Sequence, residues 1–368
     1  MARRVLIIPD KFKGTLSAKN AASAIARGWK KSHPEDAVEL LPMCDGGEGF
    51  GEIISRCLGA RSRKIKTVDA AHQSIETRWW WEPKTKTAVI ESANIIGLAM
   101  LPPKKFHPFQ LDTFGLGKVF RAAQKLGCRH CLIGIGGSAT NDGGFGLARG
   151  LGWKFLDGDG KAIDEWTKLN SLATSLPPPA RDAVRMKITV AVDVQNPLLG
   201  KRGATRVYGP QKGLRAKDFP RAEKALEQLA KIARKNLGAD FAKRAGAGAA
   251  GGLGFGLMAF LQAKAESGFD IFSKSASLDR HLRKTDLVLT GEGALDEQTL
   301  MGKGVGQIAL LCQKHKIPCV GIAGIVIDPP KSKKLFTAVH SLRQITSLRN
   351  AKMRAAEFLE KLAAEIPA

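Results

Sequence analysis

A glycine-rich segment, residues 131–144, carries the side chains with the clearest chemical potential. Its short apolar run ends in five glycines mixed with hydroxyl, amide and carboxylate side chains. Glycine lets a ligand approach the main chain closely, and successive N–H groups ahead of a helix bind anions such as phosphate. A carboxylate beside phosphate indicates a divalent cation or a proton in transfer. The residues that we expect to bind a phosphate-bearing cofactor are Gly136, Gly137, Ser138, Thr140, Asn141 and Asp142.

Residues 134–139 of this segment also fit the dinucleotide pattern G-x-G-x-x-A. The next apolar run ends at Asp157, about where a ribose-binding acid belongs. This pattern would make the chain an NAD-dependent dehydrogenase. In a dinucleotide fold the helix begins inside the motif, whereas residues 141–144 here interrupt its first turn. The dehydrogenase remains an alternative, as does a glycine turn that binds no ligand.

Four other segments share a design in which an apolar strand runs into glycine and a carboxylate. They are residues 5–15, 40–49, 190–200 and 287–296. The strand–helix alternation along the chain indicates an α/β fold. In open α/β sheets, ligands bind beyond the carboxyl ends of the strands, so these segments predict one convergent cleft. Taken alone, Asp45 or Glu48 would more often be a turn acid or a helix cap.

The order and spacing of these motifs resemble those of the bacterial glycerate kinases of the glycerate 2-kinase type. Lys11 departs from the family, where we expect serine, and Cys44 stands where we expect alanine. The matching segments are residues 9–18, 44–49, 133–144, 196–200, 208–213, 248–254 and 290–296.

The resemblance implies an ATP- and Mg²⁺-dependent kinase with two α/β domains. A Rossmann-like, mixed-sheet domain would combine residues 1–94 with 285–368. A second α/β domain, residues 95–284, would be inserted between them, and the active-site cleft would lie between the two domains. The products would be ADP and phosphoglycerate, with 2-phosphoglycerate favoured over 3-phosphoglycerate.

Residue chemistry suggests individual roles in phosphoryl transfer, which requires positioning, charge neutralisation and a proton acceptor. Residues 208–213 read as a rigid turn that presents Lys212 to phosphate. Candidate magnesium ligands are Asp193 and Glu292, and candidate proton acceptors are Asp45 and Asp296. Lys13, Thr15, Ser17, Glu48 and Asn196 are the candidate glycerate-binding residues.

The composition bears on which classes of partner and which cellular location the protein has. The net charge is +24, but the basic clusters are dispersed and aromatic residues make up 6% of the chain. A nucleic-acid-binding protein remains a weaker alternative, because such proteins concentrate their basic residues on one face. The positive charge would also speed the capture of anionic substrates. Six scattered cysteines form no disulfide framework. No apolar run approaches the ~20 residues that cross a bilayer, and we expect a cytoplasmic enzyme.

Two helices can be placed from periodicity. Ser17 is expected to cap a helix that buries Ala18, Ala22, Ile25 and Trp29. The last helix is expected to bury Ala355, Leu359, Leu362 and Ile366. Short strands are predicted at residues 287–289, 320–322 and 337–339.

Overall fold

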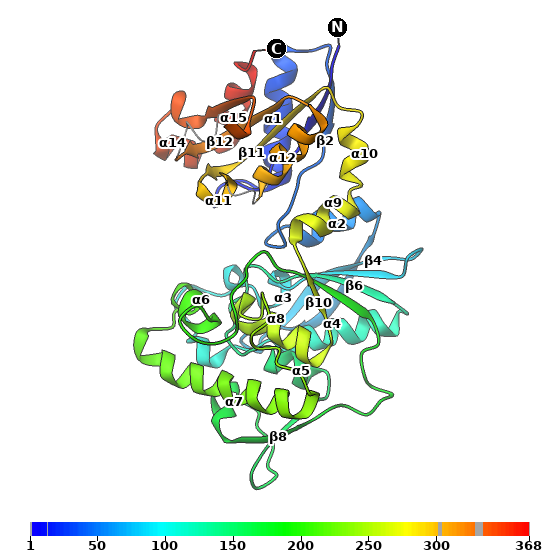
Figure 1. The fold of residues 1–368 in the computed structure, drawn as a ribbon, viewed down its shortest axis with the longest axis vertical. Coiled ribbons are helices and arrows are strands. Elements are labelled where there is room, and N and C mark those ends of the chain that lie inside the picture. The colour runs from blue at the N-terminus through cyan, green and yellow to red at the C-terminus, as the bar shows by residue number, and fades with distance from the viewer. Residues whose placement is uncertain (1, 13, 301–303, 328–333, 368) are drawn as a thin grey trace. The chain divides into compact units, whose positions relative to one another are not determined.

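The computed structural model describes residues 2–12, 14–300, 304–327 and 334–367. The chain forms two compact units. The terminal unit combines Met1–Asp45 with Phe269–Ala368, and the inserted unit is Gly46–Gly268. In Figure 1 the terminal unit contains the darkest blue segment, up to Asp45, and the orange-to-red elements, so segments from both ends of the sequence belong to it.

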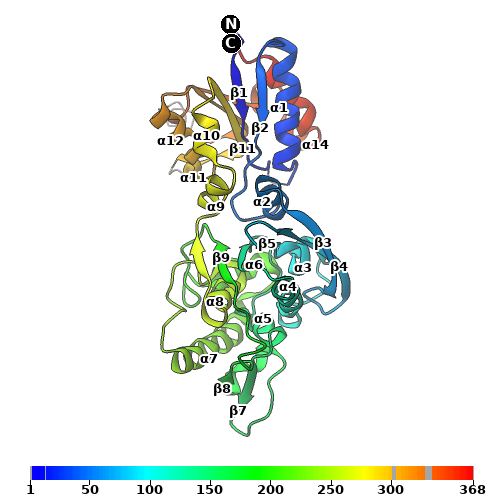
Figure 2. The ribbon, with the colours of Figure 1, turned by 90° about the vertical axis from the view of Figure 1, so that its right-hand side faces the viewer.

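The terminal unit is built on a parallel sheet whose described strands lie in the order β13-β12-β11-β1-β2. Its interior strand β1 is apolar, and Val5, Leu6 and Ile7 are almost fully buried, as expected for a parallel strand covered on both faces. Helices cover both faces, with α1 and α14 on one side and α10 to α12 on the other (Figure 2). The strands are β1 (Arg4–Ile7), β2 (Ala37–Leu40), β11 (Leu287–Leu295), β12 (Cys319–Val326) and β13 (Ala338–Ser341).

The predicted helix that Ser17 caps is present after β1. Helix α1 (Ala18–Ser32) begins at Ser17, whose side chain accepts a hydrogen bond from the Asn20 amide. Its four predicted core residues are buried, as are the four predicted for the last helix, α15 (Ala355–Ala364). Gly28 brings α1 and α15 together, because a Cβ there would lie 2.0 Å from the Glu360 carbonyl oxygen. The unit's other helices are α9 (Gly268–Ser275), α10 (Leu278–Leu282), α11 (Glu297–Leu300), α12 (Val305–His315) and α14 (Leu348–Met353).

The inserted unit contains a mixed sheet whose strands lie in the order β10-β9-β6-β5-β4-β3. The first four of these are parallel, and β4 and β3 add an antiparallel hairpin. A separate antiparallel pair joins β7 and β8. The strands are β3 (Arg61–Val68), β4 (Ser74–Glu82), β5 (Thr87–Glu91), β6 (His130–Gly134), β7 (Lys154–Asp157), β8 (Leu172–Leu176), β9 (Lys187–Ala191) and β10 (Lys264–Glu266).

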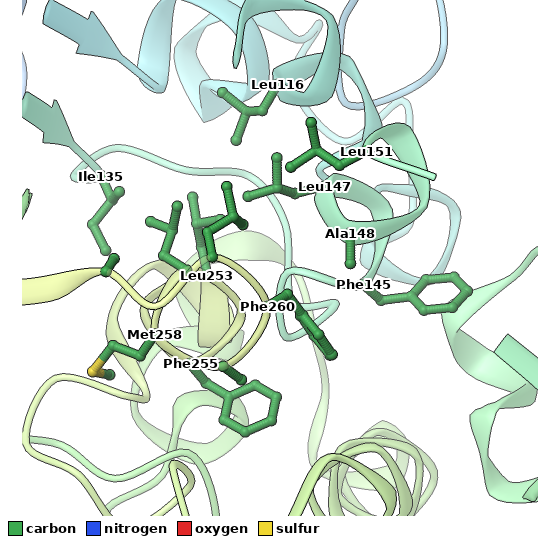
Figure 3. Packing of buried hydrophobic residues seen from close by; sticks show 14 of the residues in the cluster. Leu116, Ile135, Phe145, Leu147, Ala148, Leu151, Leu253, Phe255, Met258 and Phe260 are labelled. Carbon is green, nitrogen blue, oxygen red and sulfur yellow. The ribbon is translucent and has the colours of Figure 1, made fainter. Parts of the chain in front are cut away.

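The helices of the inserted unit pack through glycines as well as large apolar side chains. Figure 3 shows leucine, phenylalanine and methionine side chains of α4, α5 and α8 in one cluster. Next to this cluster, a Cβ at Gly144 would lie 2.7 Å from the Gly256 Cα, so the two backbones touch. The helices are α2 (Phe50–Leu58), α3 (Ala93–Ile96), α4 (Phe114–Lys125), α5 (Phe145–Gly150), α6 (Ala204–Lys212), α7 (Phe219–Leu237) and α8 (Ala249–Phe260).

The division into units differs from the predicted boundaries at 94/95 and 284/285. Strand β5 pairs along its whole length with β6, from Thr87↔His130 to Glu91↔Gly134, so residues 46–94 share a sheet with the segment that follows them. Two further predictions were wrong in detail. Strand β11 continues to Leu295 rather than ending at residue 289, and residues 208–212 belong to helix α6 rather than to a turn. No helix in the described ranges is long and apolar enough to cross a membrane.

Candidate functional site

The carboxyl ends of β1, β2 and β11 bring acidic residues together in the terminal unit. Strand β1 lies between β2 and β11, so this sheet reverses its winding direction between β1 and β11, the position where open α/β sheets bind ligands. Asp10 follows β1, and its amide donates to the Gly291 carbonyl at 2.8 Å. Asp45 follows β2, and Glu292 lies within β11. The sequence-predicted convergence of Asp45 and Glu292 is therefore present in this unit.

Glu292 is the most perturbed carboxyl group of this edge. Burial raises its pKa to about 7, and the nearby carboxylates of Asp10, Asp296 and Asp45 add to the shift. The Thr299 hydroxyl opposes the shift by donating to Oε1 at 2.6 Å. Gly304, the N-cap of α12, lies close by, because a Cβ there would lie 3.6 Å from Oε2. Near neutral pH this carboxyl can therefore gain or lose a proton.

Lys11, the departure from the family pattern, pairs with this acidic edge. Its ammonium lies 3.1 Å from Oδ1 of Asp45, and its amide donates to Asp10 at 2.7 Å. Asp296 accepts a 3.3 Å hydrogen bond from the Thr299 amide, so it also shapes the turn after β11. Among the residues that the structure describes, this edge thus brings together four carboxyl groups and Lys11.

In the inserted unit, Asp142 is directed inward. Its carboxylate accepts hydrogen bonds from the amide and hydroxyl of Thr113, at 3.0 and 2.7 Å, and from the amides of Gly144 and Gly146. Burial raises its pKa to about 6, helped by Asp112 and opposed by these donors. The predicted cofactor-binding acid therefore has internal contacts, and it shapes the glycine loop from behind.

The hydroxyl and amide side chains of the glycine loop also make hydrogen bonds within the protein. Ser138 and Thr140 share a 2.9 Å hydrogen bond between their hydroxyls. Asn141 donates to the Thr205 hydroxyl at 3.1 Å, while its Oδ1 is buried without a partner among the described residues. Gly136 donates its amide to the Gly46 carbonyl at 3.2 Å. Two sequence-predicted motifs, residues 46–49 and 134–144, therefore lie side by side.

Lys212 reaches this loop from α6. Its ammonium donates to the Thr140 carbonyl at 2.6 Å and is buried. Burial lowers its pKa to about 7, while Asp142 opposes that shift. A Cβ at Gly251 would lie 2.8 Å from the Lys212 Nζ, so this glycine leaves the space that the amine occupies.

Other predicted site residues make hydrogen bonds within the protein. Asp193, after β9, accepts from the Gly268 amide at 3.0 Å, and Asn196 accepts from the Tyr208 hydroxyl at 2.7 Å. The Thr15 hydroxyl donates to the Phe12 carbonyl at 2.8 Å, and Ser17 caps α1. Glu48 is exposed. Lys13 lies outside the described residues.

The two predicted metal ligands belong to different units, Asp193 to the inserted unit and Glu292 to the terminal unit. Within the described ranges, no group of three or more His, Cys, Asp and Glu side chains forms a complete metal site.

Glu91 is a buried carboxylate beside the 44–49 motif, and the sequence did not reveal its position. It ends β5, is buried, and accepts hydrogen bonds from the Gly49 and Gly51 amides, both at 2.9 Å. A charged residue closing the apolar strand 87–91 was the available signal. Its amide partners lie 40 and 42 positions earlier in the chain, however, and no local pattern connects them.

Known proteins with similar sequences and structures agree on one family. Residues 5–368 match the model of the glycerate kinase family. A glycerate kinase of Bacillus subtilis (strain 168) is 36% identical over 99% of this chain and 97% of its own length. A glycerate 2-kinase of Escherichia coli (strain K12) is 37% identical over 88% of this chain and 86% of its own.

A crystal structure from Salmonella typhimurium LT2, provisionally named glycerate kinase 2, superposes with a TM-score of 0.81 at 32% identity, covering 99% of this chain and 97% of that one. Nothing in these similarities supports the dehydrogenase or the nucleic-acid-binding alternative. The helix after the glycine loop also begins at Phe145, beyond the dinucleotide motif. The chain belongs to the glycerate kinase family and is a kinase, an enzyme class that uses a nucleotide substrate.

Proposed function

We propose that this enzyme transfers the γ-phosphoryl group of ATP to the 2-hydroxyl of glycerate, with Mg²⁺ as cofactor. Family membership across residues 5–368 supports the reaction, and the E. coli glycerate 2-kinase supports the position of transfer. The structural observation that carries the proposal is the acidic edge of the terminal unit, where Glu292 has a pKa of about 7. Carboxylates clustered in this way can hold a divalent cation and leave a neighbouring carboxylate to accept a proton.

In this reaction the glycerate hydroxyl oxygen forms a bond to the γ-phosphorus, and the bond from that phosphorus to the β–γ bridging oxygen breaks. The hydroxyl proton passes to a carboxylate, for which we propose Asp45 or Asp296, and ADP leaves. The amides of Gly136, Ala139 and Thr140 donate within the protein, so we propose that those of Gly137, Ser138 and Asn141 receive phosphate oxygens. Lys212 would support the loop from behind. Thr15, Ser17, Glu48 and Asn196 remain our candidates for holding glycerate, together with Lys13.

The acidic edge has the donor chemistry that Mg²⁺ requires. Mg²⁺ prefers oxygen ligands and is usually held by one or two carboxylates plus substrate phosphates, so a partial protein site is the expected arrangement. Glu292, with Asp10 and Asp45 nearby, supplies such oxygens, and the mutual repulsion that raises its pKa would be relieved by a cation. When bound, Mg²⁺ would neutralise charge on the transferring phosphate. Asp193 is the corresponding candidate in the inserted unit.

The proposal is tested with purified protein, ATP, Mg²⁺ and either D- or L-glycerate. We expect ADP release with one enantiomer, loss of activity with EDTA, and a ³¹P NMR spectrum of the product that matches 2-phosphoglycerate. A product matching 3-phosphoglycerate would refute the position of transfer. Folded protein that releases no ADP with either enantiomer would refute the reaction. NADH serves as the control nucleotide in thermal-shift assays, in which only Mg-ATP should stabilise the protein.

A further inference from the structure

Helix α6 presents a row of hydrogen-bonding side chains to the loops of the inserted unit. Thr205 accepts from Asn141, Tyr208 donates to Asn196, and Lys212 donates to Thr140. Their spacing of three and four residues places all three on one face of the helix. This face therefore fixes the glycine loop at two successive residues, Thr140 and Asn141.

The contact made by Lys212 differs from the other two because its acceptor is the main chain. The Thr140 carbonyl oxygen lies 2.6 Å from the ammonium, and the side chain is buried. A hydrogen bond to a peptide oxygen restrains the orientation of that peptide and of the amide that follows it. Below its pKa of about 7 this side chain is a charged donor, and hydrogen bonds from a charged donor are stronger than neutral ones.

A second segment is shaped around the same bond. Ala250, Gly251 and Gly252 have left-handed backbone conformations, with φ of 55°, 69° and 86°. A Cβ at Gly251 would lie 1.9 Å from the Thr140 carbonyl oxygen and 2.8 Å from the Lys212 Nζ. The Gly251 carbonyl in turn accepts from the Gly143 amide at 3.1 Å. Left-handed conformation is unfavourable for alanine, so this turn is held in place by its surroundings.

We propose that Lys212 is a positioning residue for phosphoryl transfer, which acts through the Thr140 carbonyl and does not itself contact the phosphate. Its ammonium joins α6, the glycine loop and the 250–252 turn, and so fixes the direction of the loop amides before a nucleotide arrives. Asp142 is the acid whose charge acts on the ammonium, and it holds the far end of the same loop. The inference rests on the proposed function in taking residues 136–144 as the phosphate-binding loop.

Hydrogen exchange of the nucleotide-free protein tests this role without requiring activity. We compare the wild type with Lys212→Met and Lys212→Gln, using Lys231→Met, an exposed residue of α7, as the matched control. Loss of a charged hydrogen bond predicts that amides of residues 138–146 exchange about 10-fold or more faster in Lys212→Met. Lys212→Gln, which can still donate to a carbonyl, should exchange more slowly than Lys212→Met. Unchanged exchange in both Lys212 variants would overturn the proposal.

Kinetics supply the second readout. A positioning role predicts that Lys212→Met lowers kcat by about 10-fold or more with a smaller change in the KM for ATP, and that Lys212→Gln recovers part of the loss. Equal loss in the two variants, with KM for ATP as the main change, would identify a direct phosphate contact and overturn the proposal. If Lys212→Met fails to fold, the Lys212→Gln comparison decides alone. Failure of the proposed function would instead appear as an inactive wild type with intact exchange differences.

Discussion

Replacing Glu292 by glutamine should change the pH dependence of stability in a defined direction. The pKa of this carboxyl is raised from 4.5 to about 7 in the folded protein, mainly by burial. Below pH 4.5 the group is protonated in both the folded and the unfolded chain, so its ionisation contributes nothing. Between pH 4.5 and 7 the unfolded chain loses its proton first, which favours unfolding. Above pH 7 the folded protein carries the full cost of the buried charge.

The shift corresponds to a cost of at most about 3 kcal/mol above pH 7. Glutamine removes the charge and keeps an oxygen that can accept from Thr299. We therefore expect the melting temperature of Glu292→Gln, relative to wild type, to rise between pH 5 and pH 8.5 by on the order of 5 °C. The measurement is differential scanning fluorimetry in EDTA, so that no divalent cation neutralises the site.

The control is Glu297→Gln, which removes an exposed carboxylate from neighbouring α11 and should show no such trend. At pH 8, adding Mg²⁺ should stabilise the wild type more than Glu292→Gln, because only the wild type offers the carboxylate. A melting-temperature difference that stays constant from pH 5 to 8.5 would refute the reasoning that burial and neighbouring carboxylates hold Glu292 near its neutral form.

Further substitutions test the remaining assignments. Ala250→Gly should stabilise the protein by about 1 kcal/mol in urea denaturation, whereas Gly251→Ala should destabilise it by more than that, because its Cβ meets the Thr140 carbonyl. Equal effects would contradict the left-handed turn. If Asp193 holds metal, Asp193→Asn should lower the rate, and a higher Mg²⁺ concentration should partly restore it. A rate that does not depend on the Mg²⁺ concentration would exclude the metal role and leave Asp193 only its hydrogen bond to Gly268. Asp45→Asn or Asp296→Asn should lose about 10²–10⁴-fold in kcat without recovery by Mg²⁺; normal kcat in both would exclude them as proton acceptors.

The structural features that could be predicted from the sequence are those that depend on residues close together in the chain. The capping serine and the apolar spacing at residues 17–29 located α1. The apolar runs ending in glycine and acid located the loops that carry Asp45 and Asp142, although β2 ends at Leu40 and not at Asp45 as predicted. Both depend on residues within a few positions of each other. Strand pairing does not, and the pairing of β5 with β6 is what assigns residues 46–94 to the inserted unit.

The direction in which the acidic side chains point could not be predicted from the sequence either. Asp142 stands in a loop rich in ligand-type residues, yet its carboxylate is taken up by Thr113, 29 positions earlier, and by the helix that follows. The reason lies in burial, since a carboxylate removed from water must find donors wherever the fold supplies them. A sequence can indicate that an acid stands at a strand end, but the donors that satisfy it come from distant segments.

Two helix starts in the inserted unit follow the same plan. Gly49-Phe50-Gly51 opens α2 and Gly144-Phe145-Gly146 opens α5, and both phenylalanines are fully buried. In each case a buried carboxylate accepts from the amides of the two glycines, Glu91 for α2 and Asp142 for α5.

These carboxylates occupy the helix N-termini that dinucleotide and P-loop folds offer to phosphate. If the glycine loop binds phosphate as we propose, amides ahead of the helix must meet it, and those of Gly136, Ala139 and Thr140 already donate within the protein. The Thr140 carbonyl of this segment accepts from the Lys212 ammonium, and Gly251 of the 250–252 turn packs against it. The same arrangement gives a physical reason why a G-x-G-x-x-A match need not indicate a dinucleotide site.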